Sequence, residues 1–219
     1  MDLTNELVHE PVLVAITGAT SSGKSTFSQE LCERLEAHSP VLLNQDRYFR
    51  DFRDVPMADR EAAVTSNHPR AVLSDELITH LGKLKAGQPV SVPVSGTRAQ
   101  MRGDAPSELG PSLVIILEGH LIFNEPGVVE LSDLLVFVDA NVHERVVRRL
   151  LRDTASGKTS LGKATAWYRR DVIPNVAAFS EAKRNIADLI IPFDQENGLA
   201  AQILADWIAK KVGHLRGHV

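Results

Sequence analysis

The chain has 219 residues, a length that suits one domain with a substantial buried core. Apolar residues make up 43% and charged residues 24%, ordinary values for a folded protein, which argues against a disordered chain. The net charge of -4 gives no general reason to expect a nucleic acid or an anionic membrane as partner. Any positive field that binds a ligand must therefore be local.

Cys32 is the only cysteine, which rules out an intrachain disulfide and a cysteine-based metal cluster. The opening sequence MDLTNELVHE is acidic and lacks the positive region and the apolar core of a signal peptide. Apolar runs such as VLVAI are far shorter than the roughly 20 residues that a membrane span needs. The sequence predicts a cytoplasmic protein that binds neither membrane nor nucleic acid.

Short apolar runs rich in β-branched residues alternate with longer helical patterns along the chain. Strands are predicted at residues 12–17, 41–44, 113–117, 134–138 and 189–191, and helices at residues 24–37, 74–86, 143–154 and 199–212. Strands that are apolar throughout are typical of a parallel sheet covered by helices on both faces. The alternation predicts an open, doubly wound α/β fold in a single domain, residues 1–219.

Two segments interrupt this alternation. Residues 46–70 are polar, and residues 87–111 are rich in proline and glycine. Long connections without regular structure in a compact domain are more often functional than linking. Both segments are predicted to be functional insertions.

Polar residues follow four of the predicted strands. The first of these strands is followed by the stretch GATSSGKST, and the others end at or just before Asp46, Glu118 and Asp139. In open α/β sheets, ligands bind outside the carboxyl ends of the strands. The sequence therefore predicts that these four strand ends converge on one ligand site.

The sequence GATSSGKST after the first strand is the strongest signal in the chain. Gly18, Gly23, Lys24 and Ser25 satisfy the phosphate-binding pattern G-x-x-x-x-G-K-[ST], and the pattern lies between a predicted strand and helix. Glycines let successive N–H groups face a phosphate, and the following helix adds its positive end. Lys24 can bridge the β and γ phosphates of ATP, while the Ser25 hydroxyl can bind Mg²⁺. The nucleotide-binding set is Gly18, Ala19, Thr20, Ser21, Ser22, Gly23, Lys24, Ser25 and Thr26.

Other motifs, present or absent, distinguish classes of nucleotide-binding protein. The chain contains neither the D-x-x-G nor the N-K-x-D motif, which argues against a GTPase switch. A kinase needs a base near the acceptor hydroxyl and a device that excludes water. Glu118 lies where an acid can hold Mg²⁺ or its water shell, and His120 is interpreted as a packing or turn residue.

The segment HERVVRRLLRD predicts an amphipathic helix with a basic face. At about 100° per residue, Arg145, Arg148, Arg149 and Arg152 share one arc, and apolar residues occupy the other side. The Gly- and Lys-containing loop TASGKTSLGKA follows, so residues 145–172 are predicted to form a lid over the phosphates. Arg149, Arg152 and Lys158 are candidates to stabilise the transferring phosphoryl group.

These motifs together resemble the uridine kinase and phosphoribulokinase group of P-loop kinases, and most closely the uridine kinases. The matching pieces occur in the same order over residues 12–192: GATSSGKST, NQDRYFR, NHP, PVSGTRAQMR, LEGHLIF, FVDANVHERVVRRLLRD and KRNIADLIIP. The resemblance implies a P-loop fold with five parallel strands, a helical lid and a homo-oligomer. It also implies that Asp46 orients or deprotonates the acceptor hydroxyl, with magnesium-bound ATP at Lys24, Ser25 and Glu118.

The acceptor-binding motifs depart from the family pattern. Asn67, His68 and Pro69 stand where uridine kinases usually have Asp-His-Pro, whose aspartate binds the ribose hydroxyls. The family's base-reading pattern P-x-Y-D-F, followed by histidine and arginine, lacks its aromatic residues here and has Gln100 in place of the histidine. The predicted substrate-binding residues are Asp46, Tyr48, Asn67, His68, Gln100, Arg102 and Glu118.

Two hypotheses follow from different functional classes. The first is an ATP-dependent kinase that phosphorylates a hydroxyl of a small molecule, with the 5′-hydroxyl of a nucleoside as the main candidate. A different riboside or a non-nucleoside alcohol is the alternative acceptor. The second hypothesis is a P-loop binding or regulatory protein whose acceptor site has degenerated. Asp46 and the basic lid face favour the kinase, because a protein that only binds nucleotide needs neither.

Overall fold

A computed structural model describes residues 10–216 and confirms the predicted α/β fold. Five parallel strands form the sheet in the order β2-β5-β1-β6-β7. They are β1 (Val12–Thr17), β2 (Val41–Asn44), β5 (Val114–Glu118), β6 (Leu134–Asp139) and β7 (Leu189–Pro192). Each lies within one residue of a predicted boundary.

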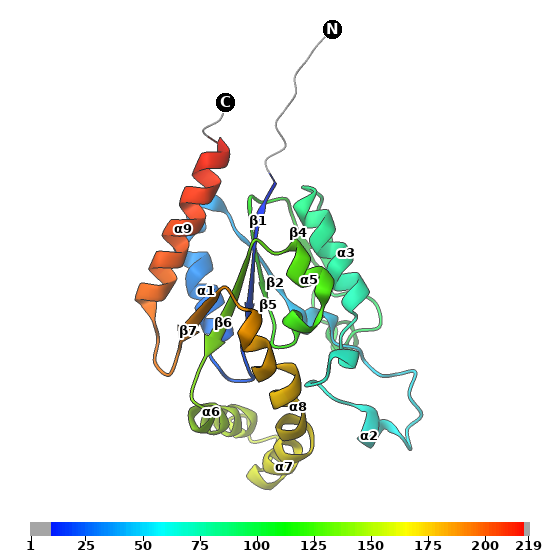
Figure 1. Ribbon diagram of the computed structural model, residues 1–219. Helices are drawn as coiled ribbons and strands as arrows, with labels where there is room; N and C mark the ends of the chain where they lie inside the picture. The colour runs from blue at the N-terminus through cyan, green and yellow to red at the C-terminus, as the bar shows by residue number, and fades with distance from the viewer. Residues whose placement is uncertain (1–9, 217–219) are drawn as a thin grey trace.

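Helices cover both faces of this sheet and extend beyond one of its ends (Figure 1). They are α1 (Lys24–Arg34), α2 (Arg60–Ala63), α3 (Ser74–Lys85), α4 (Arg98–Met101), α5 (Pro126–Leu131), α6 (Val142–Thr154), α7 (Leu161–Trp167), α8 (Ile173–Phe179) and α9 (Gly198–Arg216). None of the helices within residues 10–216 has the length and apolar character that crossing a membrane requires.

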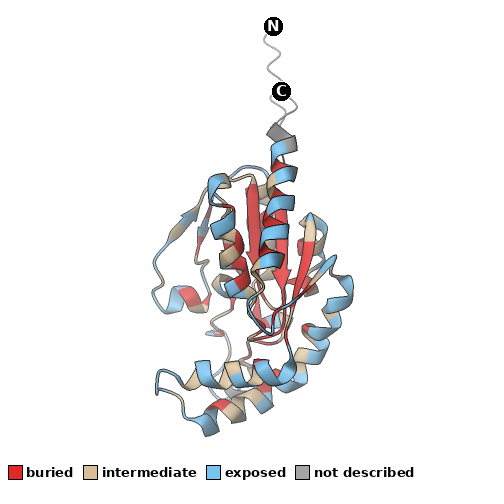
Figure 2. Cartoon of the chain, turned by 90° about the vertical axis from the view of Figure 1, so that its left-hand side faces the viewer, coloured by how far each residue is buried: buried red, intermediate tan, exposed pale blue. Residues whose placement is uncertain are grey.

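The central strand β1 divides the hydrophobic core into two layers. Val14 and Ile16 pack in the cluster that includes residues of α1 and α9, whereas Leu13 and Ala15 pack in the cluster that includes residues of α3. Side chains alternate between the faces of a strand, so a strand buried on both sides must be apolar throughout. The strands β1 and β5 are accordingly buried along their whole length at the centre of the molecule (Figure 2).

The first helix is shorter than predicted. The pattern predicts a helix over residues 24–37, but α1 ends at Arg34 and a 3₁₀ turn, Glu36–His38, follows it. Ser39 has a positive φ of 46°, and a proline comes next. Because proline disfavours helical backbone in the preceding residue, the chain turns here toward β2.

The two predicted insertions form a joint structure beside β2. Residues 87–111 contain the antiparallel hairpin of β3 (Val90–Val92) and β4 (Ser107–Leu109), together with α4. Its backbone bonds to the other insertion, since Arg98 N donates to Phe49 O at 2.8 Å and Asp51 N donates to Gly96 O at 2.9 Å. The insertions therefore build one wall together.

The predicted lid is a helical excursion at the carboxyl ends of the strands. Figure 1 shows α6, α7 and α8 together below the sheet. A π-helical turn, Tyr168–Val172, joins α7 to α8, so the helical structure continues past the predicted limit at residue 172. π-Helical turns are rare and occur frequently at functional sites.

Candidate active site

A cavity of about 270 Å³ lies at the carboxyl ends of β1, β2 and β5. It is lined by Thr20, Lys24, Ser25, Asn44, Asp46, Phe49, Ser66, Arg98, Arg102, Glu118, Gly119, His120, Arg149 and Arg152. These residues come from the P-loop, both insertions, the end of β5 and the lid. Among them are the four predicted catalytic residues, Asp46, Lys24, Arg149 and Arg152, and the two predicted metal ligands, Ser25 and Glu118.

Three of the four predicted strand ends meet at this cavity. Asp139, at the end of β6, is the exception, because its carboxylate accepts from Arg184 Nε at 3.2 Å and it does not line the cavity. β2, β5 and β1 are adjacent in the sheet, whereas β6 lies on the other side of β1. The prediction that Asp139 joins the ligand site is therefore wrong.

The P-loop backbone requires glycine at both glycine positions of the phosphate-binding pattern, Gly18 and Gly23. A Cβ on Gly18 would lie 2.4 Å from Val138 O, and a Cβ on Gly23 would lie 2.3 Å from the Phe193 ring. Gly23 also has a φ of 94°, which side chains disfavour. Any side chain at either position would therefore clash with its neighbours. Glycine at both positions lets the loop curl around phosphate groups at the start of α1.

The other residues of the predicted nucleotide-binding set differ in exposure. Ala19, Thr20 and Ser22 are buried, Ser21 and Gly23 are partly buried, and Ser25 and Thr26 are exposed. Thr20 lines the cavity and its Oγ1 accepts from Arg149 Nη1 at 2.7 Å. The P-loop is therefore in direct contact with the lid.

Lys24 and Glu118 are the oppositely charged groups at the base of the cavity. Burial lowers the pKa of Lys24, although the nearby charges of Glu118 and Asp46 counteract this effect. Burial raises the pKa of Glu118, while the nearby Ser25 hydroxyl and the charge of Lys24 oppose the shift. Both groups are desolvated, so bound phosphate or metal would interact strongly with them.

Glu118 has one oxygen that suits a metal ion. Its side chain is 3% exposed, and Oε1 accepts from Asn44 Nδ2. Oε2 is buried without a hydrogen-bond partner among the described residues. Mg²⁺ is commonly held by one or two carboxylates, phosphate oxygens and water, so the oxygen donors of Glu118 and Ser25 fit it.

Asp46 lies two residues after the end of β2 and lines the cavity. Its backbone N–H donates to Asn44 Oδ1 at 2.7 Å, which caps the 3₁₀ turn Gln45–Tyr48. Asn44 thus fixes the backbone of Asp46 and also contacts Glu118. The Asp46 side chain remains exposed to the cavity, as a base that receives a proton from a bound acceptor must be.

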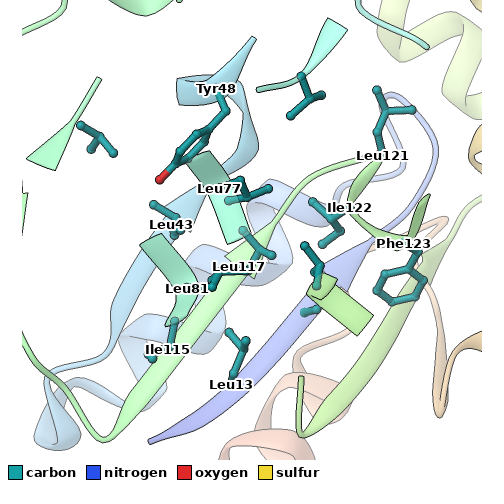
Figure 3. Close-up of a cluster of buried hydrophobic side chains, with 14 of the residues drawn as sticks. Leu13, Leu43, Tyr48, Leu77, Leu81, Ile115, Leu117, Leu121, Ile122 and Phe123 are labelled. Carbon is teal, nitrogen blue, oxygen red and sulfur yellow. The ribbon is translucent and has the colours of Figure 1, made fainter. Parts of the chain in front are cut away.

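The structure places Tyr48 in the core and not on the cavity. Tyr48 is fully buried, and its hydroxyl lies 2.7 Å from His80 Nδ1. Figure 3 shows the ring among Leu43, Leu77 and neighbouring apolar side chains. The predicted substrate contact of Tyr48 is corrected to a packing role, because residues on one turn point to different sides of the wall.

Three further predicted substrate residues lie away from this cavity. Asn67 Nδ2 donates to Asp171 Oδ2 at 2.5 Å, and Gln100 Oε1 accepts from Gly96 N at 3.0 Å. His68 lines a neighbouring cavity of about 580 Å³ and packs 4.5 Å from the Phe179 ring centroid. Arg102 does line the site, where its guanidinium is paired with Asp104 at 2.9 Å.

Only half of the predicted basic face of α6 reaches the cavity. Arg149 and Arg152 line it, but Arg145 is 6% exposed and pairs with Glu181 at 2.5 Å. Arg148 Nη1 donates to Phe193 O at 3.2 Å, so it attaches the lid to the end of β7. Arg145 and Arg148 are therefore anchors, although they share the predicted basic face with Arg149 and Arg152.

Two other lid predictions change with the structure. Lys158 is exposed and does not line the cavity, so it does not supply a charge to the phosphates in this conformation. On the side of α6 expected to pack, Val147 and Leu151 are 53% and 65% exposed. Spacing along a helix shows which residues share a face but not which face meets the core.

Arg149 and Arg148 are adjacent arginines with different expected roles. Arg149→Gln is expected to lower turnover about 10²-fold, because a cavity charge that stabilises the transferring group is lost. Arg148→Gln is expected to retain most turnover and to lower the free energy of unfolding by about 1 kcal/mol through lost hydrogen bonds. Steady-state kinetics and thermal unfolding of both variants test this division. Equal losses of turnover would contradict it.

Sequence reasoning missed several residues of the cavity wall. Arg98 donates to Ser66 Oγ and to Thr65 O, both at 2.6 Å. His120 lines the cavity, and its Nε2 lies 2.7 Å from Ser66 O, so it binds backbone as predicted for a turn residue. Burial and the charge of Lys24 lower the pKa of His120 to about 3, which keeps the ring neutral. The signal for Arg98 was its place within PVSGTRAQMR, two residues before Gln100.

Comparison with known proteins identifies the family. Residues 13–200 match the model of the phosphoribulokinase / uridine kinase family. The chain is 33% identical to a uridine kinase of Oceanobacillus iheyensis, over 92% of this chain and 95% of that protein. It is 34% identical to a uridine kinase of Limosilactobacillus reuteri, over 95% of this chain and 94% of the relative.

Solved structures agree on the fold. A putative fructose transport system kinase from Silicibacter sp. superposes with a TM-score of 0.67 at 26% identity, covering 88% of this chain and 93% of that one. A D-glycerate 3-kinase from Cryptococcus neoformans shares the fold, with a TM-score of 0.64 and 13% identity over 85% of this chain and 88% of that one. Both the family model and the relatives match most of the chain. The chain therefore belongs to the phosphoribulokinase / uridine kinase family and is an ATP-dependent phosphotransferase.

Proposed function

We propose that the protein transfers the γ-phosphoryl group of ATP to a primary hydroxyl of a small acceptor, with the 5′-hydroxyl of a uridine-like nucleoside as the leading candidate. The observation that best supports this proposal is that Asp46 lines the same cavity as Lys24, Ser25 and Glu118. A group that can take a proton thereby lies beside groups that can bind phosphate and metal. Curated relatives named uridine kinase support the nucleoside as acceptor.

In the proposed mechanism, Asp46 orients the acceptor hydroxyl and takes its proton as the oxygen attacks the γ-phosphorus. The bond from the γ-phosphorus to the β–γ bridging oxygen breaks, and ADP leaves with that oxygen. Lys24, Arg149 and Arg152 balance the negative charge on the phosphoryl oxygens. The lid helices cover the cavity and exclude water, which limits hydrolysis of ATP.

Mg²⁺ is proposed as the metal partner of ATP. Bound at Ser25 and Glu118, it would neutralise charge on the phosphate oxygens. Support comes from the buried and unpartnered Oε2 of Glu118 beside the Ser25 hydroxyl. Within residues 10–216 no cluster of three His, Cys, Asp or Glu side chains is present, so most other ligands would be phosphate oxygens and water.

The residues at the positions of the family's ribose and base contacts give a reason to test acceptors other than pyrimidine nucleosides. Asn67 and Gln100, which replace the family's ribose and base contacts, both bond to other protein groups. A structural relative at 26% identity is described as a fructose transport system kinase. A non-pyrimidine riboside, or a non-nucleoside alcohol such as a sugar, is therefore the second candidate acceptor.

An ADP-release assay across uridine, cytidine, purine and nicotinamide ribosides, sugars and simple alcohols tests the proposed function. We expect one nucleoside to stimulate ADP formation well above acceptor-free hydrolysis and to yield its 5′-monophosphate, identified by mass spectrometry. Stimulation by a sugar alone would assign the second candidate. If ATP binds but no acceptor stimulates ADP release, the result would support the alternative of a P-loop binding protein.

Two predictions about the whole protein accompany this proposal. The family resemblance predicts a homo-oligomer, which light scattering of the purified chain can test. The single cysteine and the net charge of -4 predict a cytoplasmic location without nucleic-acid or membrane partners.

A further inference from the structure

Ser66 belongs to the insertion segment that the family resemblance associates with the acceptor ribose. Within this segment, Asn67 is 5% exposed and its amide is directed to Asp171. Ser66, the preceding residue, instead lines the cavity that contains Asp46. The residue of this segment that is available to a bound acceptor is therefore Ser66.

Ser66 is held in place from three directions. Its backbone N–H donates to Asp171 Oδ2 at 3.3 Å, and its carbonyl oxygen accepts from His120 Nε2 at 2.7 Å. Arg98 Nη1 donates to its Oγ at 2.6 Å. These partners come from the lid, the end of β5 and the second insertion, so the serine is fixed before an acceptor binds.

The contact with Arg98 determines the direction of the Ser66 hydroxyl. A guanidinium has only donors, so Ser66 Oγ is the acceptor in this bond and its own proton remains available. Among residues 10–216, no hydrogen bond that uses this proton is present. A donor next to a positive charge is strengthened, because the charge polarises the O–H bond.

The position of Arg98 places this donor on the acceptor side of the site. Arg98 lines the cavity, and its charge interacts with those of Asp171 and, more weakly, Asp46. It has no carboxylate within salt-bridge distance among the described residues, and its Nε donates to Arg50 O at 3.0 Å. Its three hydrogen bonds go to uncharged oxygen atoms, so the guanidinium holds Ser66 without a direct ion pair.

We propose that Ser66 donates its hydroxyl hydrogen to a ribose hydroxyl oxygen of the acceptor, with Arg98 as the residue that positions it. This inference rests on the proposed nucleoside kinase function. Because the reacting 5′-hydroxyl must lie at Asp46, the ribose ring must lie beside it, where Ser66 lines the wall. Ser66 thereby takes the role of Asn67, whose amide is bonded to Asp171 and does not line the cavity.

The test compares acceptor kinetics of Ser66→Ala, Ser66→Thr and the exposed-hairpin control Ser91→Ala. We expect Ser66→Ala to raise the acceptor KM about 5- to 20-fold, the effect of one lost hydrogen bond, with the ATP KM unchanged. Ser66→Thr keeps the hydroxyl and should restore the acceptor KM. Arg98→Met should raise the same KM, whereas Ser91→Ala should match the wild type.

The 2′-deoxy and 3′-deoxy forms of the best nucleoside test the contact directly. If Ser66 donates to one of these hydroxyls, the wild type should bind the analogue without it more weakly than the parent nucleoside. Ser66→Ala should bind that analogue and the parent nucleoside with the same reduced affinity. Additive losses for both analogues, or an unchanged KM in Ser66→Ala, would overturn the inference while leaving the kinase function intact. A wild type without any nucleoside acceptor would overturn the proposed function and this inference together.

Discussion

We expect Asp46→Asn to abolish phosphorylation of the acceptor while ATP still binds. Asparagine has nearly the same shape and can accept a hydrogen bond, but it cannot take the proton of the attacking hydroxyl. Loss of a general base typically lowers turnover by about 10²- to 10⁴-fold. Because Asp46 lies on the acceptor side of the cavity, beside Asn44 and Arg98, the ATP affinity should change little.

The measurements are acceptor-dependent ADP release and calorimetric ATP binding. Asp54→Asn is the matched control, since Asp54 is an exposed acid of the same insertion that pairs with Arg50 at the surface. This control should behave as the wild type. Wild-type turnover in Asp46→Asn would exclude Asp46 as the base and would leave positioning and electrostatics as the source of catalysis.

Lys24→Met is expected to produce the second large loss, of both turnover and ATP affinity. Methionine fills a similar volume but removes the charge that bridges the phosphates. Loss of one charge-stabilising donor in a water-excluded site typically costs about 10²- to 10³-fold in turnover. Burial raises the pKa of Glu118, and the charge of Lys24 opposes this rise. Removing the charge of Lys24 should therefore raise the pKa of Glu118 further.

ATP binding, ADP release and thermal unfolding should be measured together for Lys24→Met. Lys83→Met, an exposed lysine on α3, is the control for loss of a positive charge elsewhere. An unchanged ATP affinity in Lys24→Met would contradict the assigned phosphate contact. A loss of ATP affinity with unchanged turnover at saturating ATP would restrict Lys24 to ground-state binding.

The predicted fold followed from features that are local in the chain. Each strand is a short apolar run, because both faces of the sheet are covered, and the P-loop pattern lies between a strand and a helix. The strand-end rule then placed Lys24, Asp46 and Glu118 in one site, and the structure brings them together. Asp139 failed the same rule because strand order, which decides which ends are neighbours, depends on long-range pairing.

The individual side-chain contacts were harder to predict than the elements. Tyr48 and Asp46 lie on the same 3₁₀ turn, yet one is in the core and the other on the cavity. Arg145 and Arg149 are one helical turn apart, but the first pairs with Glu181 and only the second lines the cavity. Arg98 and Ser66 meet over a separation of 32 residues, which no local pattern encodes.

The sequence by itself determined the α/β fold, the ATP-binding loop, the phosphotransferase class and the candidate base Asp46. These depend on glycine conformation, charge and the periodicity of apolar residues, all of which are properties of neighbouring positions. Tertiary structure decided which arginines line the cavity, that Tyr48 is packed in the core, and that Ser66 rather than Asn67 lines the cavity. Those outcomes depend on packing between distant segments, where a side chain's direction is set by the partners that surround it.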